Sequence, residues 1–313
     1  MSTAHVDEGA DVPPPRLEEV SPGLFAYIQM DGSWGLNNTG FIVGGEGVLV
    51  IDTCFTERRS RWFQEAIRRT AGDRPLRTLV NTHHHGDHTH GNWLFLPAAT
   101  IIGHERCRAE VVAAGVSTTA IFAGVEWGEI RPAPPFVTFD DRLNVYVDDL
   151  RVELIYVGPA HTTNDIVAWV PERKVLYAGD IIFHQGTPFA MMGSIAGWLE
   201  ALERLRRLDV RTIVPGHGPV CGPEVIDDVG AYLRFVQETA HRGYEAGLAP
   251  LEVAKETDLG RFSALLDPER LVGNLHRAYS ELRGEPLGTP LPLAAILPEM
   301  VAYNGGRMPR CLA

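Results

Sequence analysis

Short apolar runs, broken by glycine, proline and aspartate, dominate roughly the first two-thirds of the chain and predict β-strands. A glycine-rich turn at 44–47 joins two of these runs into a β-hairpin. The second strand of the hairpin is apolar up to its last residue, Asp52, so we expect it to be buried and Asp52 to need polar partners. The predicted strands cover residues 24–28, 37–43, 48–52, 76–80, 99–103, 143–147, 152–157, 165–170, 175–178 and 210–214.

Apolar residues at helical spacing predict helices between these strands and through the last third of the chain. Thr56 is suited to cap the first helix. In the last helix we expect Asp267 as the cap, Pro268 in the first turn and Gly284 just past the end. The predicted helices cover residues 58–70, 105–114, 194–208, 224–244, 251–257 and 267–283.

This order of elements predicts an α/β fold in which two strand-rich halves form two sheets face to face, with helices outside. Residues 1–16 are read as a flexible N-terminal arm, residues 17–222 as the α/β domain and residues 223–313 as a helical extension packed on the same domain. The N-terminal residues lack the basic and apolar segments of a signal peptide, so a cytoplasmic location is expected.

Charge and composition exclude several classes of partner. The net charge is −12, from 28 basic and 40 acidic side chains, and no run of Lys or Arg offers a basic face for nucleic acid or a membrane surface. No segment approaches the roughly 20 apolar residues of a membrane helix. The spacing of the four cysteines suggests reduced thiols rather than a disulfide framework.

Candidate chemistry is concentrated in residues 81–92, which read NTHHHGDHTHGN and hold five of the twelve histidines. The stretch follows the predicted strand 76–80, and loops at the carboxyl ends of strands commonly carry the chemistry of α/β folds. Imidazole and carboxylate are the ligands that suit zinc and related metals. The alternative, a purification tag or a solvated histidine run, fits poorly because the stretch is internal and framed by a strand and a glycine.

Three further residues with ligand chemistry follow predicted strands and have glycine nearby. His161 follows the strand 152–157, Asp180 follows the strand 175–178 and His217 follows the strand 210–214. One such residue would be unremarkable in a turn, but three together with the histidine-rich loop form a set. Glycine beside each residue allows the backbone to approach a ligand closely.

This set resembles the metallo-β-lactamase-fold superfamily, whose His-x-His-x-Asp-His motif is matched by residues 83–88. The resemblance implies a four-layer αββα sandwich and two divalent metal ions, which are expected to be Zn²⁺, although iron and manganese accept the same ligands. It implies that Asp52 holds the ligand loop from outside, that a metal-bridging hydroxide is the nucleophile and that Asp87 can handle protons. The implied ligands are His83, His85 and His161 on the first metal, Asp87, His88 and His217 on the second, and Asp180 as the bridge.

Over nearly the whole chain, the stretches 32–40, 157–165, 214–227 and 301–313 resemble bifunctional cyclase/thioesterases of aromatic, type II polyketide biosynthesis. That resemblance implies closure of the second ring of a polyketide bound to an acyl carrier protein, followed by hydrolysis of its thioester. The alternatives are a general hydrolase of the same fold, such as a lactonase, a glyoxalase-II-like thioesterase or a β-lactamase, and a binding module without activity. Asp180 stands where branches with a cysteine ligand would carry Cys.

An aromatic polyketide requires a large apolar pocket near the metals. The candidates for its lining are Trp34, Trp93, Phe183, His184, Phe189, Met191 and Met192. For several of them, a place in the hydrophobic core explains the residue type equally well. His84 and His90 fall outside the motif positions and are expected to be bystanders. The sequence does not predict an oligomeric state.

Overall fold

The computed structural model describes residues 13–122 and 124–313, so residues 1–12 of the predicted arm lie outside the described part. Its first sheet has the strand order β1-β2-β3-β4-β5-β6-β7. Pairing is antiparallel from β1 to β4 and parallel from β4 to β7. The strands are β1 (Arg16–Ser21), β2 (Leu24–Ile28), β3 (Thr39–Val43), β4 (Val48–Ile51), β5 (Leu76–Val80), β6 (Thr100–His104) and β7 (Val137–Phe139).

The second sheet has the order β12-β11-β10-β9-β8. Only the pair β11–β12 is parallel among the strand pairs described for this sheet. The strands are β8 (Arg142–Val147), β9 (Leu150–Tyr156), β10 (Ile166–Val170), β11 (Val175–Phe183) and β12 (Thr212–His217).

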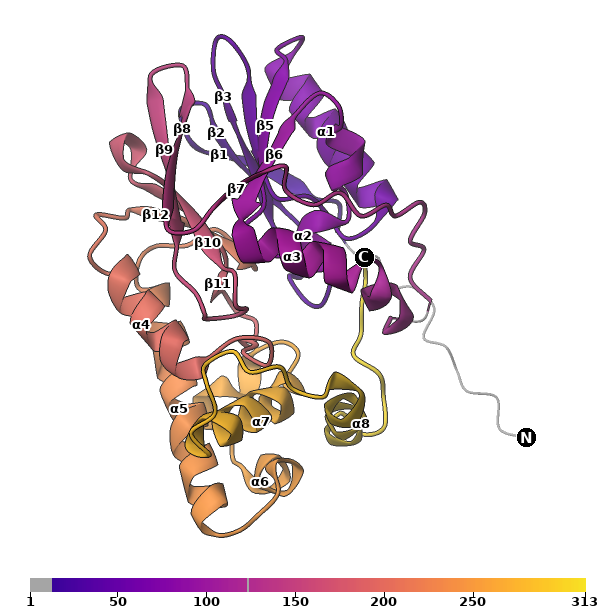
Figure 1. The fold of residues 1–313 in the computed structure, drawn as a ribbon, viewed down its shortest axis with the longest axis vertical. Helices are drawn as coiled ribbons and strands as arrows, with labels where there is room; N and C mark the ends of the chain where they lie inside the picture. Colours follow the sequence, from indigo (N-terminus) through magenta and orange to yellow (C-terminus); the bar gives the residue numbers. More distant parts are fainter. Residues whose placement is uncertain (1–12, 123) are drawn as a thin grey trace.

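The two sheets pack face to face with helices on both outer faces, as Figure 1 shows. Leu49 of the first sheet and Leu154 of the second belong to the apolar core between the sheets. On the outer face of the first sheet, α1 (Glu57–Ala71) contributes Phe63 to another core. Helix α4 (Ile195–Leu205) lies against the second sheet. The predicted four-layer αββα sandwich is therefore confirmed.

The remaining helices continue the core of the second sheet into the C-terminal part of the chain (Figure 1). Leu176 of β11 shares one buried cluster with Leu233, Leu275 and Met300, which come from three C-terminal helices. The boundary proposed at residue 222 stays a prediction. The helices are α2 (Gly86–Thr89), α3 (Glu105–Ala114), α5 (Val225–Glu245), α6 (Pro250–Glu256), α7 (Arg270–Leu282) and α8 (Leu293–Tyr303). Short 3₁₀ segments are η1 (Asn92–Phe95), η2 (Ser117–Ala120), η3 (Pro171–Arg173) and η4 (Gly260–Ala264).

The structure corrects the sequence-based elements in several places. Strand β11 runs past the predicted end at residue 178, so Asp180 lies within a strand rather than after one. Asp267 does not cap the last predicted helix, because α7 begins at Arg270 with Glu269 at the cap position and Asp267 has a left-handed φ of 57°. Strand β1 and helix α8 were not predicted. Within the described residues, no helix is both long and apolar enough to span a bilayer.

Candidate metal centre

The ends of several strands bring the candidate ligands to one edge of the sandwich. Asp52 directly follows β4, and the histidine-rich loop follows β5 and enters the short helix α2. His161 lies in the loop between β9 and β10, while Asp180 is inside β11 and His217 is the last residue of β12. The parallel pairing of β4 with β5, and of β11 with β12, places these residues beside one another at the gap between the two sheets.

The first group consists of His83, His85, His161 and Asp180, whose possible ligand atoms all lie within 4.8 Å of one another. His161 Nε2 is 3.2 Å from Asp180 Oδ2, and His83 Nε2 is 3.9 Å from the same oxygen. His85 Nδ1 lies 2.9 Å from His161 Nε2. Three imidazole nitrogens thus surround one carboxylate oxygen.

The second group consists of Asp87, His88 and His217, also with ligand atoms within 4.8 Å of one another. His217 Nε2 is 3.3 Å from Asp87 Oδ2 and 3.4 Å from Asp180 Oδ2. His88 Nε2 is 3.1 Å from Asp180 Oδ1. Asp180 therefore contacts both groups and lies where a bridging ligand is expected.

Hydrogen bonds on the outer side of the cluster fix the orientation of the rings. The Nδ1–H groups of His88 and His217 donate to Asp52 Oδ2 at 2.9 Å and to Gly32 O at 3.0 Å. His161 Nδ1 donates in the same way to the backbone carbonyl of Phe189. With the proton on Nδ1, each Nε2 presents a lone pair to the centre of the cluster, which is the form that binds a metal.

Asp52 holds the ligand loop through three contacts. Its carboxylate accepts the backbone N–H and the hydroxyl of Thr82, each at 2.7 Å, in addition to His88 Nδ1. The Thr82 hydroxyl oxygen also lies 3.1 Å from His83 Nδ1, where it can accept that ring's proton. Asp52 has a positive φ of 59°, an unusual conformation for a non-glycine residue that these contacts hold in place. One buried carboxylate therefore orients a ring from each group.

The inner atoms of the cluster suit a cation. His83 Nε2, His88 Nε2 and Asp180 Oδ1 are buried and have no hydrogen-bond partner, although the last two atoms are close together. Lone pairs directed at one another in a buried site are costly unless a proton or a metal ion lies between them. Imidazole nitrogens and carboxylate oxygens are ligands for divalent transition metals, zinc among them. The cluster therefore fits divalent metal ions.

The electrostatics of the cluster keep its central carboxylate ionised. Burial opposes the charge of Asp180, but the surrounding imidazoles, His217 foremost, hold its pKa well below the ordinary value. Burial also lowers the pKa of His83 and His85, which favours their neutral, metal-binding forms. In His217 burial opposes the positive charge, but the carboxylates of Asp180 and Asp87 together raise the pKa to about 9. The two carboxylates thus favour a positive charge at the centre of the cluster.

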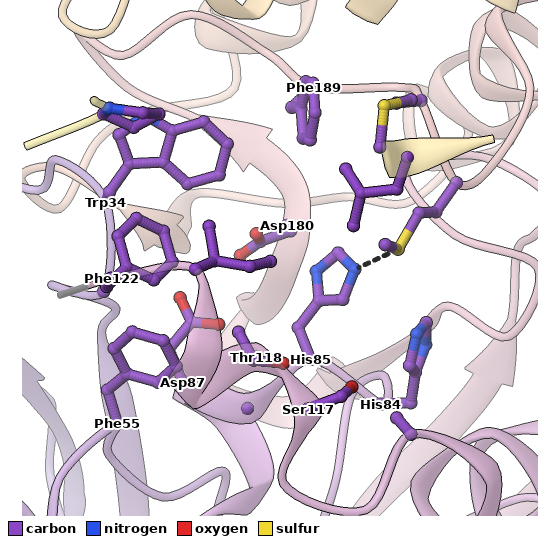
Figure 2. A pocket seen from close by; sticks show the side chains of 18 of the residues that line it. Trp34, Phe55, His84, His85, Asp87, Ser117, Thr118, Phe122, Asp180 and Phe189 are labelled. Carbon is purple, nitrogen blue, oxygen red and sulfur yellow. Dashed lines mark hydrogen bonds between the residues drawn. The ribbon is translucent and has the colours of Figure 1, made fainter. Parts of the chain in front are cut away.

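An apolar cavity opens directly beside the cluster, as Figure 2 shows. It offers about 170 Å³ to the centres of water-sized molecules, and about 1160 Å³ of atom-free space when its open mouth is included. That is room for an organic substrate rather than a single water molecule. Its lining includes His85, Asp87, His161, Asp180 and His217 from the cluster, and Trp34, Phe183, Phe189, Met191 and Met192 from the predicted pocket.

Two residues predicted for the pocket lie elsewhere. Trp93 packs with the core outside the first sheet, and the guanidinium of Arg131 covers its ring at 4.8 Å. His184 bonds through Nδ1 to the backbone oxygen of Pro219 at 2.9 Å and lines a separate cavity. The prediction for Trp93 failed because a tryptophan after the metal loop suits a core equally well. His184 lies only four residues after Asp180, but it follows the end of β11 and bonds to Pro219 rather than entering the cavity beside the cluster.

His84 and His90 join neither candidate metal group. His84 Nδ1 lies 3.0 Å from Asn164 Nδ2, and His90 Nδ1 lies 3.2 Å from the oxygen of Phe55. Both side chains nevertheless line the cavity. Both residues were expected to be bystanders, and the structure places them outside the two ligand groups but in the wall of the cavity.

Several residues of the site were missed from the sequence. Thr82 directly precedes the motif and was not among the candidates. Its hydroxyl lies between Asp52 and His83 in the structure, and a threonine directly before a ligand histidine could have indicated this role. Phe55 and Leu297 also line the cavity. Leu297 lies on α8, whose apolar run is interrupted by prolines that conceal a helical pattern.

Comparison with known proteins agrees with the fold and the motif. A family model for the Metallo-beta-lactamase superfamily matches residues 32–217, which is more than half of the chain. The chain therefore belongs to the metallo-β-lactamase superfamily.

Curated relatives differ in their named activities. The chain is 31% identical over 186 residues to the 2,4-dinitroanisole O-demethylase subunit alpha of Nocardioides sp. (strain JS1661), covering 58% of this chain and 53% of the relative. It is 24% identical to the linear primary-alkylsulfatase of Pseudomonas sp. (strain ATCC 19151), covering 84% of this chain and 60% of the relative. The chain thus spans little more than half the length of these two relatives.

Solved structures show the same fold at low sequence identity. The metallo-β-lactamase from Pontibacter korlensis superimposes with a TM-score of 0.59 at 18% identity, covering 71% of this chain and 99% of that protein. The DIM-1 metallo-β-lactamase gives a TM-score of 0.58 at 21% identity, covering 72% of this chain and 99% of that protein. More than a quarter of this chain therefore has no counterpart in these two structures.

Proposed function

We propose that this chain is a metal-dependent hydrolase that cleaves an ester, thioester or related bond next to a bulky apolar group. The observation that carries the proposal is the convergence of seven ligand-type side chains at the end of an apolar cavity. A polar cluster of this kind beside an apolar cavity can bind a substrate and present its reacting bond to the metal ligands.

The residues have distinct tasks in this proposal. His83, His85, His161 and Asp180 would hold one divalent cation, and Asp87, His88, His217 and Asp180 the other. When bound, such cations polarise a carbonyl oxygen and allow water to ionise near neutral pH. Net hydrolysis adds the elements of water across the bond and yields an acid and an alcohol or thiol.

Asp87 is the ligand-type carboxylate with the larger exposed fraction, 14% of its side chain, and it lines the cavity. Burial opposes its charge, but His88 and His217 hold its pKa below the ordinary value. A lowered pKa keeps Asp87 ionised, so it suits a metal ligand better than a general acid. A thiolate is a good leaving group that needs little protonation, so a thioester requires no stronger acid than the cluster provides.

The test measures metal content and hydrolysis together. Purified protein is assayed for bound zinc, iron and manganese, and against a panel of thioesters, lactones, alkyl sulfates and β-lactams. We expect bound divalent metal and hydrolysis of at least one class, both lost in Asp87→Ala and retained in Asp149→Asn, which changes an exposed turn residue. Protein that binds metal but cleaves none of the panel would favour a binding module and overturn the proposal.

We further propose a narrower function, hydrolysis and second-ring cyclisation of an aromatic polyketide thioester delivered on an acyl carrier protein. Its support is the resemblance of residues 301–313 and three other stretches to that family, and a cavity lined by aromatic and methionine side chains. The relatives described above have other names, so the general hydrolase is the better supported function.

A comparison of substrates separates the narrower function from the general one. The same aromatic acyl group is offered on an acyl carrier protein and on a small thiol. A cyclised product and a clear preference for the carrier-bound form would support the polyketide function. Equal rates on both forms, with no ring closure, would rule it out and leave the general hydrolase in place.

A further inference from the structure

The wall of the cavity is formed by segments that are far apart in the sequence. Trp34, Phe55 and Phe122 lie together on one side of the cavity, with Asp87 and Asp180 beside them (Figure 2). Ring centroids of Phe122 lie 5.9 Å from Trp34 and 5.8 Å from Phe55. These contacts make one continuous aromatic surface that begins at the metal ligands.

Another part of the wall comes from the C-terminal part of the chain. Leu293, Leu297 and Met300 of α8 line the cavity, and Pro309 follows them. All four residues lie beyond residue 217, where the match to the superfamily ends. The superfamily model therefore does not describe this part of the wall.

Specific contacts hold this wall in position. His276 of α7 lies 2.8 Å from Glu299 of α8. Beyond α8, the chain reaches α1, where Arg59 donates to the backbone oxygen of Leu312 at 2.9 Å. The chain is therefore anchored by a side-chain contact on each side of Pro309.

The charge of the lining argues for an uncharged substrate portion. Among the described residues that line the cavity, Arg270 is the one with a permanently cationic side chain. Its guanidinium lies 4.1 Å from the Trp34 ring centroid, and its Nη groups contact Thr187 O and Asp267 Oδ2, each at 2.9 Å. The Asp267 carboxylate balances the positive charge of Arg270. The buried Nε of Arg270 has no hydrogen-bond partner.

We propose that the cavity binds the uncharged, apolar acyl or aryl portion of the substrate, and that Leu297 sets how large that portion can be. The inference rests on the proposed hydrolase function and deepens it by naming the substrate class. Leu297 is chosen for substitution because its side chain is half-buried, whereas Met300 is 1% exposed and also belongs to the core.

The test uses acyl thioesters of one small thiol on the metal-loaded protein, with acetyl, octanoyl, naphthoyl and ω-carboxyoctanoyl groups. We expect kcat/KM for octanoyl and naphthoyl to exceed that for acetyl by at least about 10-fold, because each buried methylene favours binding. The terminal carboxylate should lower kcat/KM at least about 10-fold relative to octanoyl, because Arg270, the permanently cationic side chain among the described lining residues, is already paired with Asp267. Equal rates across the series would overturn the inference.

Variants at Leu297 test the size limit. Leu297→Trp fills the cavity and should lower the naphthoyl-to-acetyl ratio of kcat/KM at least about 10-fold, and Leu297→Ala should raise it. Leu282→Trp is the matched control, because Leu282 lies at the exposed end of α7 and does not line the cavity. An equal loss on all substrates in Leu297→Trp would show a general disturbance and overturn the role of Leu297.

Binding measurements separate failure of this inference from failure of the proposed function. Calorimetry with the non-hydrolysable octanoyl, naphthoyl and ω-carboxyoctanoyl amides measures their binding affinity in the absence of hydrolysis. Preferential binding of the uncharged amides, lost in Leu297→Trp, would support the substrate class even if no thioester were cleaved. Absence of any preference would overturn it even if hydrolysis were observed.

Discussion

The metal cluster and the wall formed by α8 are two parts of one cavity that are built in opposite ways. The cluster lies within residues 32–217, the part that matches the superfamily, and its buried polar side chains are oriented by hydrogen bonds. The α8 wall lies beyond that match and consists of apolar side chains. The comparison teaches that the candidate metal ligands all lie within the part that the superfamily model describes, whereas the proposed size limit on the substrate depends in addition on residues beyond it.

The two parts should therefore respond differently to substitution. Hydrogen-bonded imidazoles require defined tautomers, so a small change disturbs the cluster as a whole. Apolar packing tolerates changes of similar volume and loses free energy in proportion to the atoms removed. Variants in the cluster should abolish metal binding, whereas variants in the wall should change stability and substrate range.

The largest effect is expected for Asp180→Asn. Asp180 contacts His88, His161 and His217, and an amide removes the negative charge that draws cations to both groups. Because loss of an outer hydrogen bond already costs about 10–100-fold, loss of this central ligand should cost at least about 1000-fold in activity. Elemental analysis and hydrolysis rates check this. Full metal content in the variant would contradict the bridging position.

Met300→Ala should affect the wall and spare the cluster. Met300 is buried in the core that α8 shares with the second sheet. Removing its side chain should lower the free energy of unfolding by about 3 kcal/mol. Denaturant unfolding measures the loss, and metal content should stay at the parental level. Loss of metal in this variant would mean that the two parts are not separable.

The cluster was far more predictable from the sequence than the wall. Residues 83–88 form a local motif in which each residue type is demanded by metal chemistry, so the pattern identifies the ligands directly. His161 and His217 could be added because both follow predicted strands. Asp180 was assigned as a ligand candidate because it follows the predicted strand 175–178, and the family motif gave the same residue. The structure extends β11 to Phe183, so Asp180 belongs to the cluster although the strand end was misplaced.

The α8 wall was not predictable because its residues are chosen for shape. Leu297 and Met300 have no chemistry that marks them, and Pro298 inside the helix breaks the expected pattern. Asp267 illustrates a different failure, since an aspartate before a proline resembles a helix cap, whereas the structure gives it a φ of 57° and pairs its carboxylate with Arg270, three residues further on. Residue type and spacing alone do not distinguish these two arrangements.

Asp52→Asn tests whether the tautomers organise the cluster. The amide nitrogen would face His88 Nδ1, which must then give up its proton, and the proton moves to Nε2, where the metal should bind. We expect metal affinity to fall by about 10- to 100-fold, measured by competition with a chelator. Asp149→Asn, at an exposed turn, serves as the control. Unchanged affinity would show that Asp52 supports only the backbone of the loop.

The smallest effect is expected at Asp267, where the two parts meet through Arg270 and Trp34. Burial raises the pKa of Asp267 from 3.8 to about 6, so the folded protein holds this proton more tightly than the unfolded chain. The stabilisation from this group is complete below about pH 4 and is lost as pH rises through about 6. The Asp267→Asn variant has no ionisable group at this position, so its free energy of unfolding lacks this decrease with rising pH.

The difference in unfolding free energy between the Asn variant and the parent should therefore rise by about 1 kcal/mol from pH 5 to pH 7. Urea titrations of both proteins at each pH measure it, and contributions shared by the two proteins cancel in the difference. A pH-independent difference would mean that the Asp267 carboxylate is ionised throughout this range. In that case its pair with Arg270 would be a fixed ionic contact between the cluster side and the wall.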